Sequence, residues 1–129
     1  NEREQALVLE AIVEHSKLND PKDNPVTIIL KDADRLANLG PQYFIRDAQH
    51  EEGLPAIDPR HSISNPNPGA SYHNRKTVYE GAVYTLEWEA MLRTSKARKI
   101  SKKRFKLMRK CLKDIEDQLA EVGLRPYPL

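Results

Sequence analysis

The chain has 129 residues, which is the size of a single domain, so two independent cores are not expected. Hydrophobic residues make up 39% and charged residues 31%, a balance that favours a folded chain with a modest core over a disordered one. The longest apolar runs, residues 6–9 and 26–30, are far shorter than the roughly 20 residues of a membrane-spanning helix, which excludes such a helix. The one cysteine, Cys111, cannot form a disulfide within the chain, and this favours a reducing, cytoplasmic setting.

The first two predicted elements are helices. Residues 2–17 carry apolar side chains at helical spacing, and glutamates occupy the first turn, where the helix dipole favours them. The positions that recur on the apolar face of this helix are Val8, Ala11, Ile12 and His15. Asn24 and Pro25 supply an N-cap and a proline at the first helical position, which predicts a second helix that ends near Leu39 before Gly40.

The rest of the chain divides into helices and one irregular segment. A short helix is predicted over residues 42–50, and residues 51–74 hold enough proline, glycine, asparagine and serine to predict a long loop. Helical spacing returns over residues 75–93, and a last helix is predicted over 95–122, with Gly123 as its stop. The apolar stripe of this last helix comprises Ile100, Phe105, Met108, Leu112, Ile115, Leu119 and Val122.

These elements predict an all-α helical bundle of about four to five helices with one long irregular loop. No segment shows sustained alternation of apolar and polar residues, so no strand is expected. We expect a single domain over residues 1–129, in which 1–50 and the pair of helices in 75–129 flank the loop at 51–74.

Charge is segregated along the chain. The formal net charge is −5 over residues 1–94 and +7 over residues 95–129, and residues 95–113 contain ten bases and no acid. A basic stripe of this kind is most often a solvated helix face. The next interpretation is a site for a phosphorylated small molecule, and the third is a site for nucleic acid.

The second predicted helix contains the most informative acidic residue. Leu30, Ala33, Asp34 and Ala37 lie three and four residues apart, so they share one face of the helix. A carboxylate within an apolar stripe must be paired, protonated or bound to a cation, because burial of an unpaired charge is strongly unfavourable. Asp34 is therefore a candidate metal ligand, or else the partner of an arginine in a buried ion pair. Asp32 is expected on a different face, where it is exposed or caps local donors.

A histidine closes the apolar face of the preceding helix. His15 follows Ala11 and Ile12 at helical spacing, and the short turn after it favours antiparallel packing of the first two helices. A lone histidine on an apolar face is more often a hydrogen-bonded core residue than a ligand. With Asp34 on the next helix, His15 is nevertheless the start of a metal or phosphate site.

The order and spacing of these residues resemble a known family. The sequence AIVEHS at 11–16, followed by ILKDADRL at 29–36 and by Leu39-Gly40, resembles the second half of an HD-domain metal-dependent phosphohydrolase. The segment 84–116 is similar to the C-terminal helices of the bacterial branch of that superfamily. The resemblance covers residues 6–49 and, more loosely, 78–120.

The resemblance implies a helical fold, a divalent metal ion (Mn, Mg, Fe, Ni or Zn) and hydrolysis of a phosphate ester or nucleotide by metal-bound water. It places Asp34 as a direct metal ligand and His15, the candidate catalytic residue, near the substrate phosphate. Lys31 and Arg35 flank Asp34 in sequence and are candidates for contacts with that phosphate; a salt bridge to Asp32 or to an acidic helix is the plainer interpretation for both.

The sequence departs from the family at the metal site. The family also supplies a histidine and a His-Asp doublet, and no His-Asp doublet occurs in these 129 residues. The chain starts with Asn1 directly in a predicted helix, which leads us to expect that it is part of a longer protein, that the other ligands precede it, and that its exposed apolar faces pair with a missing N-terminal half or self-associate.

Two functional hypotheses follow. The first is a phosphohydrolase of the HD superfamily, of which this chain carries only part of the metal site. The alternative is a non-catalytic helical interaction module whose basic last helix binds an acidic partner or RNA.

Overall fold

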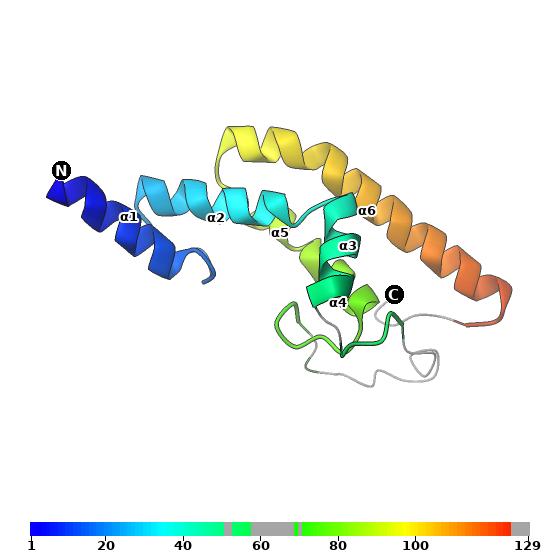
Figure 1. The fold of residues 1–129 in the computed structure, drawn as a ribbon. Helices are drawn as coiled ribbons and strands as arrows, with labels where there is room; N and C mark the ends of the chain where they lie inside the picture. The colour runs from blue at the N-terminus through cyan, green and yellow to red at the C-terminus, as the bar shows by residue number, and fades with distance from the viewer. Residues whose placement is uncertain (51–52, 58–68, 70, 125–129) are drawn as a thin grey trace.

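The computed structural model describes residues 1–50, 53–57, 69 and 71–124, and these residues form an all-α fold, as predicted (Figure 1). No strand is present in these ranges, and no helix in them combines the length and apolar character needed to cross a membrane. The helices are α1 (Glu2–Glu14), α2 (Pro25–Ala37), α3 (Pro41–His50), α4 (Val78–Thr85), α5 (Trp88–Met91) and α6 (Ser95–Glu121).

Local capping residues set most helix ends where the sequence predicts them. The side chain of Asn24 accepts hydrogen bonds from the backbone N–H groups of the first turn of α2, and Thr94 caps α6 in the same way. Gly40 and Gly123 follow α2 and α6 with positive φ angles of 76° and 75°, a backbone conformation that glycine adopts without strain. The first helix ends at Glu14, three residues earlier than the predicted Lys17.

The segment predicted as one helix over residues 75–93 forms two short helices instead. The backbone N–H groups of Leu86 and Glu87 donate to the carbonyl groups three residues earlier, which closes α4 with tight turns. After α5, Leu92 has extended backbone angles and its side chain is buried. Helical spacing therefore predicted the apolar face of this segment, but not the interruption between α4 and α5.

The core lies between α6 and the helices α3 and α4. Its buried apolar side chains are Leu39, Tyr43, Tyr79, Ala82, Leu92, Ala97, Phe105, Met108 and Leu112. The predicted stripe of α6 is buried at its centre and open at its ends, because Ile100 is 40% and Val122 70% exposed. α2 also contacts α6, and its Leu36 packs against this core, whereas α1 lies alongside α2 at the N-terminal end of the molecule (Figure 1).

The predicted apolar face of α1 is not buried in this chain. Ala11 alone is buried, whereas Ile12 and Val13 are 54% and 63% exposed, and Val8 and Leu9 are exposed as well. The physical reason is that α1 packs mainly against α2. One packing neighbour covers only a narrow stripe of a helix, so the rest of its apolar surface faces solvent.

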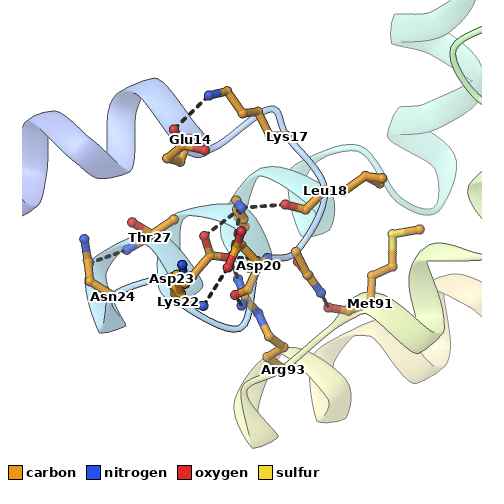
Figure 2. A network of polar contacts seen from close by, with 12 residues as sticks. Glu14, Lys17, Leu18, Asp20, Lys22, Asp23, Asn24, Thr27, Met91 and Arg93 are labelled. Carbon is orange, nitrogen blue, oxygen red and sulfur yellow. Dashed lines mark hydrogen bonds and ion pairs between the residues drawn. The ribbon is translucent and has the colours of Figure 1, made fainter.

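A buried ion-pair network joins the turn between α1 and α2 to the start of α6 (Figure 2). Lys31, on α2, is fully buried; its Nζ donates to the backbone carbonyl of Leu18 at 2.7 Å and to the Asp23 carboxylate at 2.9 and 3.0 Å. Arg93, just before α6, donates to the same carboxylate at 2.6 Å. Two cations therefore share Asp23, whose side chain is only 3% exposed.

This network makes the free energy of unfolding depend on pH under acidic conditions. Burial alone would raise the pKa of Asp23, but Lys31 and Arg93 outweigh it and lower the pKa from 3.8 to about 2. Because the pKa of Asp23 is lower in the folded than in the unfolded protein, its ionised carboxylate stabilises the fold fully at pH values above the unfolded-state pKa. This stabilisation is lost as the pH falls toward the folded-state pKa. We expect the urea midpoint of the protein to fall between about pH 4 and pH 2, and to fall less in Asp23→Asn. Superimposable acid profiles for the two proteins would contradict this assignment.

Candidate functional site

A cavity of about 460 Å³ brings together residues from four parts of the chain. It lies between the end of α1, the exposed side of α2, the segment around Tyr72 and the start of α5. The polar side chains that line it are His15, Ser16, Lys17, Asp34, Arg35, Asn38, Ser71, Tyr72, His73 and Glu87. The cavity therefore contains three of the four predicted site residues, His15, Asp34 and Arg35.

Asp34 lines this cavity from an exposed position, and the prediction that it lies within a buried apolar stripe is wrong. α2 turns a different face toward the protein: the buried positions Thr27, Lys31 and Arg35 recur every four residues. Asp34, three residues after Lys31, lies at the edge of that buried face, about 60° from Lys31 around the helix axis, and its side chain is exposed. Its carboxylate is therefore accessible to a ligand in the cavity.

Asp32 is the buried acid of α2, contrary to the prediction that it is exposed. Its side chain is 2% exposed and accepts hydrogen bonds from the backbone N–H groups of Arg93, at 3.1 Å, and Thr94, at 2.7 Å. A carboxylate suits this place because the N-terminus of α6 presents unsatisfied N–H donors and a partial positive charge. No local sequence pattern predicts this contact, because it joins residues that are 61 positions apart.

His15 is held in one tautomer at the end of α1. Its Nδ1 lies 2.6 Å from the carbonyl oxygen of Ile12. A carbonyl oxygen only accepts, so Nδ1 carries the proton, and in the neutral imidazole Nε2 keeps its lone pair. The half-buried imidazole thus offers the cavity a group that can accept a proton or bind a cation.

Arg35 provides a buried positive group at the cavity wall. It is 7% exposed, and its Nη1 has no hydrogen-bond partner among the described residues. Burial lowers the pKa of the guanidinium, while Asp32 raises it. The Nη1 atom is itself enclosed and does not face the cavity, so what Arg35 contributes there is a positive charge in the cavity wall.

Lys31, by contrast, does not reach the cavity. Its ammonium group is fully buried and bound by Leu18 and Asp23, and Lys31 is not among the residues that line the cavity. The prediction that Lys31 contacts a substrate phosphate is therefore wrong. Lys31 is an ion-pair partner, as the plainer interpretation has it, but its acid is Asp23 in the turn before α2 and not Asp32 or an acidic helix.

The described residues do not form a complete metal site. No group of three histidine, cysteine, aspartate or glutamate side chains that could hold a metal ion occurs among them. His73 and Glu87 line the same cavity as Asp34 and His15, and sequence spacing did not single them out, because they come from the loop and from a turn between short helices. His61 and most of the loop predicted at 51–74 lie outside the described residues.

The basic stretch of α6 lies away from this cavity. Lys96, Lys99, Lys102 and Lys103 are exposed, on the side of α6 opposite its buried stripe. Further along, Lys110 and Lys113 pair with acids of the same helix at 2.6–3.3 Å. The solvated-face interpretation describes this arrangement, and binding of RNA or an acidic partner stays a prediction.

Comparison with known proteins identifies a fold neighbour. No protein-family model and no curated protein matches the chain. A crystal structure of a protein from Lactobacillus plantarum, determined as a structural-genomics target, superposes with a TM-score of 0.69 at 18% sequence identity, over 88% of this chain and 61% of that one. The match shows a similar fold, and the chain spans about three fifths of the length of that protein.

Proposed function

We propose that this chain is part of a metal-dependent phosphohydrolase, in which the cavity beside Asp34 receives the phosphate of a small ester or nucleotide. The observation that carries the proposal is that one cavity gathers an accessible carboxylate, a histidine whose Nδ1 is bound to the backbone and a guanidinium in the cavity wall. The resemblance to HD-domain hydrolases assigns Asp34 and His15 to the same site from sequence order. The two arguments are independent, because the resemblance does not use the positions of side chains.

The roles of the residues follow from their chemistry. Arg35 donates to a phosphate oxygen and offsets its negative charge. His15 accepts a proton at Nε2 while its Nδ1 remains bound to the backbone. Asp34 is the metal ligand that this chain contributes, since carboxylate oxygens bind divalent cations. A divalent metal would lower the pKa of water and neutralise phosphate charge, but the described residues do not complete its coordination.

The exposed face of α1 supports the view that something else completes the site. Leu9 and Val13 are each 63% exposed, and Leu18 in the following turn is 69% exposed. Exposed apolar side chains grouped on one helix are typical of a protein–protein contact. We infer that a segment carrying further ligands, or a second copy of this chain, covers this face.

The test is metal-dependent turnover of p-nitrophenyl phosphate by the natural protein, with Mn²⁺, Mg²⁺ or Ni²⁺ supplied in turn. Asp34→Asn should lower turnover about 100-fold, which corresponds to roughly 2.7 kcal/mol of barrier, and should also lower bound metal. Glu10→Gln, an exposed acid on α1 that does not line the cavity, is the matched control. Unchanged metal content and turnover in Asp34→Asn would contradict the proposal.

A further inference from the structure

A second cleft lies beside the cavity that contains Asp34. It has a volume of about 500 Å³ and lies between α3 and the segment around Tyr72. Asn38 and Tyr72 line both spaces, so the second cleft lies next to the first. The Nδ2 group of Asn38 also donates to the backbone carbonyl of Asp34 at 3.0 Å, which fixes the boundary between the two spaces relative to the candidate metal ligand.

One wall of the second cleft carries a set of hydrogen-bond donors. Arg46, Gln49 and His50 are three and four residues apart on α3, so they share one face of that helix, and all three line the cleft and are exposed. Among the described residues, Arg46 makes one polar contact, a long one of 3.5 Å from its Nη1 to the carbonyl oxygen of Ala37. Its guanidinium can therefore reorient toward a ligand at little cost.

The described residues that line the cleft carry a net positive charge. Among them Asp47 is the one acid, and Arg75 pairs with it at 3.0 Å. Arg75 also donates to the backbone carbonyl of Tyr72 at 2.7 Å and lies over the Tyr72 ring at 4.7 Å, so it holds that ring in place. Burial raises the pKa of Tyr72, which keeps the phenol protonated as a donor. The described lining therefore holds two arginines, Arg46 and Arg75, against one aspartate.

We propose that this cleft binds a second phosphate group of the substrate, so that the ester hydrolysed beside Asp34 is a small bisphosphate. This inference rests on the proposed function for the position of the reacting phosphate. Arg46 contributes the main charge, and His50 and Gln49 contribute further donors on the same helix face. A monophosphate would fill only the Asp34 cavity and leave the donors on α3 to water.

The experiment compares two sugars that differ by one phosphate, glucose 6-phosphate and glucose 1,6-bisphosphate. Their dissociation constants are measured by calorimetry on the natural protein without added metal, so that hydrolysis does not interfere. We expect tighter binding of the bisphosphate, and we expect Arg46→Ala to reduce that preference about tenfold, the usual effect of losing one charge-assisted hydrogen bond. Lys102→Ala, which removes an exposed charge of α6 outside both spaces, should leave the preference unchanged.

The outcomes separate this proposal from the proposed function. Equal affinity for the two sugars, or a preference that persists in Arg46→Ala, would overturn the second phosphate site even if Asp34-dependent turnover is observed. If instead turnover is absent while the bisphosphate preference depends on Arg46, the cleft is a phosphate site and the hydrolase assignment fails. His50→Gln provides a second variant at the same wall, for which a smaller loss of preference is expected.

Discussion

Replacing Asp23 by alanine is expected to lower the free energy of unfolding by about 3–5 kcal/mol. The variant leaves the ammonium group of Lys31 fully buried, with the carbonyl of Leu18 as its remaining partner. It also removes the carboxylate that accepts from Nη2 of Arg93. An uncompensated charge in the interior costs far more than the pair contributes when intact, because desolvation is no longer offset. Urea unfolding followed by circular dichroism measures the change.

A second variant shows whether the buried charge is the cause. The double variant Asp23→Ala, Lys31→Met removes the stranded ammonium and should recover at least about 1 kcal/mol relative to Asp23→Ala alone. As a matched control, Asp114→Ala breaks the exposed pair with Lys110 and should cost less than about 1 kcal/mol. A double variant less stable than Asp23→Ala would show that Lys31 stabilises the fold by some other contact.

Asp32→Ala is expected to destabilise the protein by about 2–4 kcal/mol, the cost of leaving two buried backbone donors without an acceptor. Among the described residues, the carboxylate of Asp32 is the acceptor for the N–H groups of Arg93 and Thr94, at the point where the chain enters α6. Loss of a capping acceptor also frays the first turn of the helix. Chemical unfolding and amide hydrogen exchange at the start of α6 report the two effects.

The neighbouring acid provides the control for Asp32. Asp34→Ala removes an exposed carboxylate and should change stability by no more than about 0.5 kcal/mol, while it removes the proposed metal ligand. The structure thus predicts opposite phenotypes for two acids on one helix: loss of stability at position 32 and loss of activity at position 34. Equal destabilisation by both substitutions would contradict the orientation of α2 described above.

The positions of Asp32 and Asp34 show how α2 can both stabilise the fold and carry the proposed metal ligand. Its buried side, with Lys31 and Asp32, fixes the helix to the turn after α1 and to the start of α6. Its open side presents Asp34 to the cavity, and Arg35 lies at the boundary, buried but in the cavity wall. A rigid helix held by buried ion pairs is a suitable support for a ligand that must keep its position.

The sequence by itself determined the helical fold and most helix boundaries. Asn24-Pro25, Gly40, Thr94 and Gly123 act through hydrogen bonds and backbone angles within one turn, so their effect can be read locally. The periodic stripe around Phe105 likewise depends only on the spacing of residues along α6. Sequence order also placed His15 and Asp34 in one candidate site, and the structure brings both to one cavity.

Only the tertiary structure decided which face of α2 is buried, and therefore which aspartate is accessible. Apolar spacing assigned the interior to Asp34, but Lys31 and Asp32 occupy it because Asp23 and the N–H groups before α6 satisfy them there. Burial of a charge depends on partners far away in the chain, and the pattern of a single helix does not contain them. The same reason applies to α1, whose apolar face is open because burial requires a neighbour as well as a pattern.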